Sequence, residues 1–347
     1  MTEGPVITLK VTHLGPSVDD IGGMSSVIRA SLTPRPGVES EALASYALTA
    51  PLWGLSLFLR CVWQLVRRSR ARIGTLHVHL SQRGSYVREG ALIALAALRR
   101  VPVVVTIHGS SGPAFLCAHP RLVRTVLRPA LRIAVLGDRA RQRAATVLPA
   151  AKLVILTNVV PLADDVTPPA FDGSPTALFA GEVGPRKGFD VLLQAWPLVL
   201  AAVPTARLLV AGPQLAPPVP TAGVTYLGPL AHPAVLAVLE TEAWVAVLPS
   251  RHEGLPMFLL EAMSRARPVV ATDVGEVAAL VSEVGVLLQV GDPVGLAAGL
   301  VRYLSDADVA RQDGATGRNR LQQAHSPATN AEQLDRLYGV GAPASQP

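Results

Sequence analysis

Pro249-Ser-Arg-His-Glu-Gly-Leu-Pro-Met-Phe-Leu-Leu-Glu261 has the pattern of a turn that leads from a buried strand into a helix. Residues 243–248 before it form an apolar run of strand length, and Pro256 suits the first turn of a helix. In parallel α/β sheets, ligands bind at the carboxyl ends of strands, and helix N-termini favour anions. Glu253 in the loop and Glu261 on the helix are therefore candidates for gripping the hydroxyls of a sugar or a ribose. The spacing alone equally allows two solvated surface glutamates.

Length and composition indicate a globular protein with two domains. The chain has 347 residues, which suits two domains of roughly 150 to 180 residues. Half of the residues are apolar and 16% are charged, which excludes a disordered chain. The two cysteines, Cys61 and Cys117, make no metal-ligand spacing and no disulfide framework. With no signal-peptide pattern at the start, we expect a cytoplasmic protein.

The net charge of +6 comes mostly from arginines and indicates an anionic partner. Aromatic residues make up only 4% of the chain, too few for base-stacking platforms, and no nucleic-acid module is visible, so we expect no nucleic-acid partner. Residues 51–68 form a helix candidate with an apolar body and a basic end, too short to span a bilayer. This helix either lies on an anionic membrane surface or packs as an ordinary helix of the first domain.

Strand and helix patterns alternate along the whole chain, which predicts an α/β fold with parallel sheets. The Pro-rich stretch 164–175 is the natural linker, so we predict domains at 1–165 and 166–330, with a terminal helix and tail at 331–347. Strands are predicted at 6–11, 75–80, 101–107, 133–136 and 153–156, then at 177–180, 207–211, 224–227, 244–248, 268–271 and 285–288. Helices are predicted at 24–32, 51–68, 88–99, 120–128, 294–304 and 331–338.

The run from Pro249 continues as Ser264-Arg-Ala-Arg-Pro-Val-Val-Ala-Thr-Asp-Val-Gly275, and together they resemble the nucleotide-sugar site of retaining glycosyltransferases of family 4. These enzymes belong to the glycosyl transferases of group 1. The resemblance implies the GT-B fold, in which two Rossmann-like domains with parallel sheets face each other across a cleft. It also implies that Glu253 lies against the donor sugar, that Gly254 and Leu255 belong to the donor site, and that Glu261 binds the ribose. The final helix of such enzymes crosses back to the first domain.

A second loop extends the resemblance to the diphosphate. Residues 179–188, Phe-Ala-Gly-Glu-Val-Gly-Pro-Arg-Lys-Gly, match the family pattern of a strand followed by Lys-Gly before a helix. The resemblance implies that Lys187 neutralises the charge of the departing diphosphate. The arginine that the family carries after its first glycine is replaced here by Glu182. We expect Arg186 to supply the missing positive charge, with Glu182 orienting it; the alternative is a decayed site.

Two features of the first half complete the candidate site. Gly22 and Gly23 precede a helix, where backbone N–H groups can approach an anion and Ser25 and Ser26 can cap the helix. The resemblance implies that this is the glycine-rich loop over the diphosphate. His108 ends a buried strand, and the family has a histidine there that contacts the donor sugar.

These features together predict a glycosyltransferase that moves a sugar from a nucleoside-diphosphate sugar to an acceptor with retention of anomeric configuration. We expect a sugar or lipid-linked acceptor, a role in polysaccharide or glycolipid assembly, and a peripheral location on the inner face of a membrane. Neither a metal nor another cofactor is expected. The alternatives are a nucleotide-sugar epimerase of the same fold and a non-catalytic protein that binds nucleotide sugars.

Overall fold

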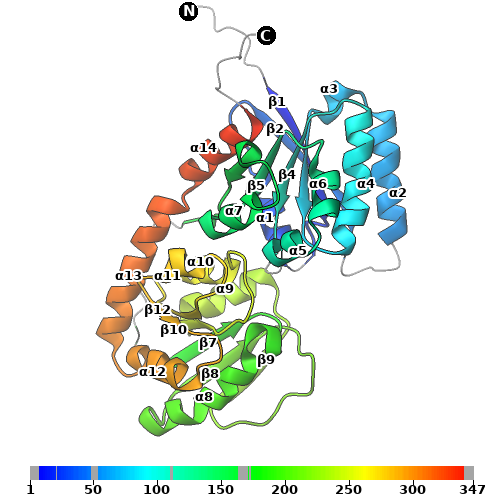
Figure 1. The fold of residues 1–347 in the computed structure, drawn as a ribbon. Coiled ribbons are helices and arrows are strands. Elements are labelled where there is room, and N and C mark those ends of the chain that lie inside the picture. Colours follow the sequence, from blue (N-terminus) through cyan, green and yellow to red (C-terminus); the bar gives the residue numbers. More distant parts are fainter. Residues whose placement is uncertain are drawn as a thin grey trace, which may run out of the picture. The chain divides into compact units, whose positions relative to one another are not determined.

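The computed structural model describes residues 8–20, 22–47, 54–109, 112–162, 171 and 173–339. The chain forms two compact units. Unit 1 comprises Met1–Asn158 and Asn330–Pro347, and unit 2 comprises Val159–Thr329. Each unit is an α/β layer structure with a parallel sheet (Figure 1).

Unit 1 contains a six-stranded parallel sheet in the order β2-β1-β3-β4-β5-β6. The chain goes from β1 outward to β2 and returns on the other side of β1 to form β3. The topological switch point, where open α/β sheets bind ligands, therefore lies between β1 and β3. The strands are β1 (Leu9–Pro16), β2 (Val38–Tyr46), β3 (Thr75–Leu80), β4 (Val103–Ile107), β5 (Arg132–Val135) and β6 (Leu153–Ile155).

Helices cover both faces of this sheet (Figure 1). Residues of α2, α4 and α6 pack in one apolar core against alternate residues of β3 and β4. Leu334 and Leu337 of α14 pack on the opposite face against Val104, Ala134 and Leu156. The helices are α1 (Gly23–Ser31), α2 (Gly54–Arg67), α3 (Arg70–Ile73), α4 (Gly84–Leu98), α5 (Gly112–Ala118), α6 (Pro120–Leu127), α7 (Asp138–Ala145) and α14 (Pro327–Tyr338).

Unit 2 repeats the architecture with the strand order β12-β11-β10-β7-β8-β9. The chain runs outward from β7 through β8 to β9 and then places β10 on the other side of β7. Its switch point therefore lies between β7 and β10. The strands are β7 (Thr176–Ala180), β8 (Arg207–Ala211), β9 (Val224–Gly228), β10 (Val245–Leu248), β11 (Val269–Thr272) and β12 (Val286–Leu288).

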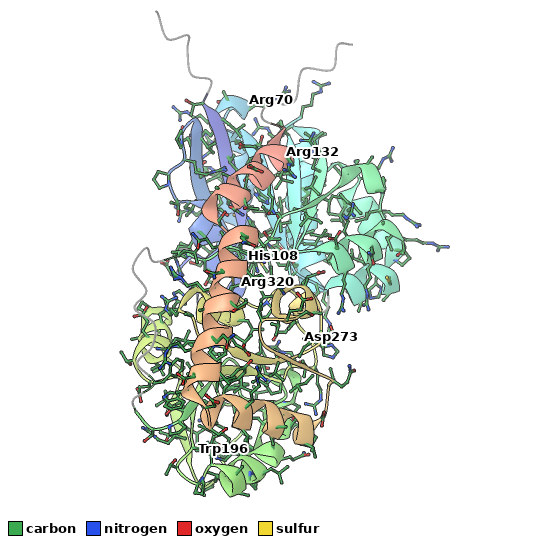
Figure 2. All side chains as sticks on the ribbon, turned by 90° about the vertical axis from the view of Figure 1, so that its left-hand side faces the viewer. Arg70, His108, Arg132, Trp196, Asp273 and Arg320 are labelled. Carbon is green, nitrogen blue, oxygen red and sulfur yellow. The ribbon has the colours of Figure 1, made fainter. Side chains whose placement is uncertain are left out.

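The core of unit 2 is built on α8 and α12, which pack against one face of the sheet. Trp196 of α8, labelled in Figure 2, is fully buried there, and its indole N–H donates to the carbonyl of Ala222 at 3.0 Å. The helices are α8 (Phe189–Ala202), α9 (His232–Thr241), α10 (Met257–Ser264), α11 (Val277–Val281), α12 (Pro293–Leu304) and α13 (Ala307–Ala324).

Some sequence expectations differ from the structure in detail, and others fall on residues that the structure does not describe. The strand predicted at 6–11 is β1, which extends to Pro16, while residues 6 and 7 lie outside the described residues. Ser25 and Ser26 lie inside α1, whose N-cap is Gly22, so they do not cap it. β2 was missed because it is an edge strand whose residues are mostly half-buried and include two glutamates. The predicted linker falls mostly outside the described residues, and so do residues 340–347 of the tail.

Candidate functional site

Two loops of unit 2 meet at the carboxyl edge of its sheet. Residues 181–188 follow β7 and residues 249–256 follow β10, and these two strands are neighbours. Gly188 has a φ of 69°, and a Cβ there would lie 1.8 Å from the backbone oxygen of Pro249. Only glycine accepts this conformation and this approach together. Gly188, which directly follows Lys187, therefore allows the two loops to pack backbone against backbone.

Lys187 and Glu253 form an ion pair between these loops. The Lys187 Nζ lies 2.6 Å from Glu253 Oε1, and the Ser250 hydroxyl donates to the same oxygen at 2.7 Å. The side chains of the pair are only 16% and 8% exposed. A carboxylate this buried needs such partners. The structure thus brings together two residues that the sequence assigned to the site separately.

Glu182, the departure from the family pattern, pairs with Arg186. Their side chains approach to 3.2 Å, and both remain partly exposed. The carbonyl of Arg186 accepts a hydrogen bond from the backbone N–H of Arg251 at 3.0 Å. Arg251 also forms a bidentate pair with Asp190 of α8, at 2.6 and 2.7 Å, and this hydrogen bonding lowers the pKa of Asp190. No pattern in the sequence predicts this second pair, which joins the loop after β10 to α8.

Glu261 lies on α10, where its side chain is 9% exposed and contacts His232. The distance from Glu261 Oε1 to His232 Nε2 is 2.9 Å. His232 opens α9, directly after β9, so it reaches the same edge of the sheet. His232 is not among the residues predicted from the sequence, although Pro233 marks a helix start at that edge. Glu261 and His232 thus form a pair at the carboxyl edge of the sheet.

The turn after β11 packs against the backbone of Glu253 and Gly254, next to Leu255. Gly275 has a φ of 56°, and a Cβ there would come within 2.2 Å of the Glu253 carbonyl oxygen. The backbone N–H of Glu276 donates to the carbonyl of Gly254 at 2.9 Å. Leu255 is buried. These contacts hold the backbone of the loop that carries Glu253.

The other predicted site residues belong to unit 1. His108, labelled in Figure 2, follows β4, and its backbone N–H donates to the carbonyl of Leu80 at 2.7 Å. Its Nε2 lies 2.8 Å from Nδ1 of His79, and burial lowers the pKa of His108 to about 4, so the ring is neutral at pH 7. Gly22 and Gly23 stand at the start of α1, at the β1 side of the switch point. Gly22 is extended, so its conformation does not require glycine.

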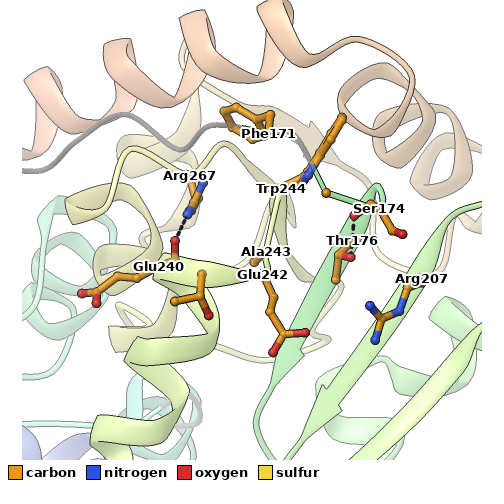
Figure 3. Close-up of a pocket in the computed structure, with 11 residues that line it drawn as sticks. Phe171, Ser174, Thr176, Arg207, Glu240, Glu242, Ala243, Trp244 and Arg267 are labelled. Atoms are coloured by element: carbon orange, nitrogen blue, oxygen red, sulfur yellow. Dashed lines mark hydrogen bonds between the residues drawn. The ribbon is translucent and has the colours of Figure 1, made fainter.

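A cavity of about 240 Å³ in unit 2 lies elsewhere (Figure 3). Thr176, Arg207 and Trp244 among its lining residues stand at or beside the first residues of β7, β8 and β10. It therefore opens at the amino edge of the sheet, opposite the loops of Lys187 and Glu253. None of the predicted site residues lines it.

Comparison with known proteins agrees with this architecture. The family model described as glycosyl transferases group 1 matches residues 174–306, which include the loops of Lys187, Glu253 and Glu261. A phosphatidyl-myo-inositol mannosyltransferase from Mycolicibacterium smegmatis is 28% identical over 281 residues, covering 76% of this chain and 70% of the relative.

Two solved structures share the fold. HepE from Anabaena, solved with UDP-glucose, superposes with a TM-score of 0.71 at 15% identity, over 96% of this chain and 100% of HepE. TarM from S. aureus, solved with UDP among other ligands, gives a TM-score of 0.66 at 15% identity. This similarity covers 82% of this chain but only 59% of the TarM chain. Residues 174–306 of the chain thus match the glycosyl transferases of group 1, and the protein is a glycosyltransferase with the GT-B fold.

Proposed function

We propose that the chain transfers a sugar from a nucleoside-diphosphate sugar to a hydroxyl group of an acceptor, with retention of anomeric configuration. The observation that carries this proposal is the contact between Lys187 and Glu253 at the switch point of unit 2. One loop offers a cation and the other a carboxylate, within 2.6 Å of each other. A nucleotide sugar needs both, because its diphosphate is anionic and its sugar presents hydroxyl donors.

Each side chain has a chemical task in this proposal. Lys187 and Arg186 stabilise the negative charge that grows on the departing diphosphate. Glu253 accepts hydrogen bonds from hydroxyls of the donor sugar, and Glu261 accepts them from the ribose. The hydrogen bonds that Glu253 receives from Lys187 and Ser250 favour binding over attack as a nucleophile. The departing phosphate then takes the proton of the acceptor hydroxyl, which attacks from the face that the diphosphate leaves.

The test is the stereochemistry of the product. Purified protein is incubated with α-configured nucleotide sugars and a panel of sugar and lipid-linked acceptors, and the anomeric configuration of the product is read by NMR. We expect an α-linked product with wild type and a strongly reduced yield with Glu253→Gln. A β-linked product would overturn retention. Release of free nucleotide with no acceptor and no linked product would instead identify an epimerase.

The Glu182–Arg186 pair supports a working diphosphate loop. Because Arg186 already neutralises Glu182, the carboxylate need not repel a diphosphate. We expect Glu182→Arg to leave the affinity for a nucleoside diphosphate unchanged at fixed ionic strength, which keeps charge screening constant. A clear gain in affinity would show that Glu182 opposes the ligand.

We further propose that the acceptor is presented at an anionic membrane surface, as in glycolipid or polysaccharide assembly. The similar protein from M. smegmatis is named a phosphatidyl-myo-inositol mannosyltransferase, and phosphatidyl-myo-inositol is a lipid. Helix α2 exposes a stripe of apolar side chains, Leu55, Leu59, Trp63 and Val66, which are 52–70% exposed. Arg67 stacks over Trp63, with further exposed arginines nearby. Among the described residues, no helix is both long and apolar enough to cross a bilayer.

Co-sedimentation with vesicles tests this surface. We expect wild type to bind phosphatidylglycerol vesicles and not phosphatidylcholine vesicles, because apolar insertion and arginine charge act together. Trp63→Ser should weaken this binding. Leu98→Ser, at an exposed apolar residue at the end of α4, is the matched control and should not. Equal binding by the two variants would exclude α2 as the docking surface.

A further inference from the structure

Four histidines lie together on one buried face of the unit 1 sheet. His13 is on β1, His77 and His79 are on β3, and His108 follows β4; each is at most 5% exposed. The strand register pairs His13 with His77, and alternate residues of a strand share a face. The His77 and His79 rings stack with centroids 4.4 Å apart, and His79 and His108 with centroids 5.1 Å apart. Parallel strands that are covered on both faces usually carry apolar side chains, so four buried histidines on one face are unusual and indicate a specific role.

Three of these rings form a continuous hydrogen-bonded row. His13 Nδ1 lies 3.0 Å from His79 Nε2, and His79 Nδ1 lies 2.8 Å from His108 Nε2. His77 is outside this histidine row, because its ring nitrogens bond the Tyr338 hydroxyl at 2.9 Å and the Thr106 hydroxyl at 2.7 Å. The histidine row therefore connects the interior of the sheet to the carboxyl end of β4.

All three rings of the row are neutral at pH 7. Burial lowers the pKa of His13 to about 3 and that of His108 to about 4, and it lowers the pKa of His79 well below its ordinary value. A neutral imidazole has one N–H and one lone pair. The row thus has two arrangements, with its shared N–H groups directed either toward His108 or toward His13.

The far end of the row distinguishes the two arrangements. His13 Nε2 is buried and has no hydrogen-bond partner among the described residues. Were the row directed toward His13, this nitrogen would carry a buried N–H without an acceptor, in the positive field of Arg35. When the shared N–H groups are directed toward His108, His13 Nε2 carries a lone pair. The positive charge of Arg35 favours a lone pair over an N–H group at this nitrogen.

We propose that His13 and His79 are positioning residues that fix His108 in its Nδ1–H tautomer. Nε2 of His108 then accepts from His79, and the Nδ1–H remains as the donor at the carboxyl end of β4. Neutral histidine in water prefers the Nε2–H form, so the row imposes the less common tautomer. The role of this tautomer in transfer rests on the proposed function. An N–H group whose position is fixed in advance can donate a hydrogen bond to an oxygen of the nucleotide sugar without reorganising.

A metal site is the competing use of these residues. His13, His77 and His79 offer nitrogens that lie within 4.8 Å of one another, and zinc accepts three histidines. A metal must lie in the plane of each ring, along the lone pair. The His77 and His79 planes are only 25° apart in a stack, so their lone pairs do not converge. The geometry favours the hydrogen-bonded row.

The experiment is ¹⁵N NMR of the full chain, labelled at histidine, without substrate at pH 7. Long-range proton–nitrogen spectra of wild type should show His108 as the Nδ1–H form. His79→Leu should release His108 to the Nε2–H form or a mixture, and His79→Asn, whose amide can donate from near the Nδ1 position, should restore the wild-type signal. The matched control is His77→Leu, at an equally buried residue of the same strand and face, and it should leave the tautomer unchanged.

Three results would overturn the proposal. They are an Nε2–H His108 in wild type, an equal effect of His77→Leu and His79→Leu, and a joint shift of the His13 and His79 signals on adding stoichiometric Zn²⁺. The first needs no variant, so a failure of a variant to fold leaves the proposal testable. In transfer assays, kcat of His79→Leu should fall on the order of tenfold with KM little changed, and His79→Asn should recover it. If the protein does not catalyse the proposed transfer, this kinetic effect is absent, but the expected tautomer of His108 in the NMR spectra is the same.

Discussion

Gly188→Ala should destabilise unit 2 far more than Gly228→Ala, although the two glycines have the same φ of 69°. A left-handed conformation costs alanine about 1–2 kcal/mol at either position. A Cβ at Gly228 meets no heavy atom within 4 Å, whereas at Gly188 it meets the Pro249 carbonyl oxygen at 1.8 Å. Overpacking of this kind adds about 1–3 kcal/mol. The difference between the two variants therefore measures the contact between the loops of Lys187 and Glu253.

Differential scanning calorimetry of both variants gives the comparison. For a unit of this size, each kcal/mol moves Tm by about 2–4 °C. The transition of unit 2 in Gly188→Ala should therefore lie roughly 2–12 °C below that in Gly228→Ala. Nucleoside diphosphate affinity should fall only in Gly188→Ala, because only there is the site loop displaced. Equal Tm values and equal affinities would refute the argument that backbone packing of the two loops builds the site.

Lys187→Ala should lower kcat on the order of 10²–10³-fold, because it removes a charge from the leaving-group loop. Lys152, whose ammonium donates to the carbonyls of Arg128 and Ala130, is the control: Lys152→Ala should leave kcat unchanged, and equal mild effects of the two substitutions would argue against the loop assignment. Glu261→Ala should weaken nucleoside diphosphate binding at least tenfold in calorimetry, since a hydrogen bond to a charged group contributes about 1.5–3 kcal/mol, and unchanged affinity would remove Glu261 from the site. Acid should destabilise unit 1: the folded pKa values of His13 and His108 are depressed below the unfolded value of 6.5, so stability is full above pH 6.5 and is lost as pH falls. Between pH 6 and pH 5 these two rings together should cost about 2 kcal/mol, measured by hydrogen exchange of the β3 and β4 amides, and equal protection at both pH values would contradict their burial as neutral groups.

The sequence predicted the alternation of strands and helices, and the GT-B fold was confirmed. Local signals sufficed where apolar runs ended in turn residues, as in residues 243–248 before Pro249. They failed for β2, whose edge position leaves it half-buried and removes the apolar pattern. They also failed at helix starts, where Gly22 and not the neighbouring serines occupies the N-cap.

At the candidate site, the sequence named single residues but not their partners. Nothing in the spacing of Lys187 and Glu253 reveals that they touch, since 66 positions separate them and only the β7–β10 pairing brings their loops together. His232 escaped notice for the same reason. The roles of His108, Gly22 and the other assigned residues remain predictions.

A thermal-shift screen measures whether the carboxyl edge of unit 2 binds a nucleoside diphosphate. Wild type and a Lys187→Ala, Glu261→Ala double variant are heated with UDP, GDP, ADP and dTDP. A ligand at 100 times its Kd stabilises by about 2.7 kcal/mol, which for unit 2 raises Tm by roughly 5–11 °C. We predict such a rise for at least one nucleotide with wild type and its loss in the double variant. A screen in which no nucleotide raises Tm, or in which the double variant responds as wild type does, would rule out nucleotide binding at this edge.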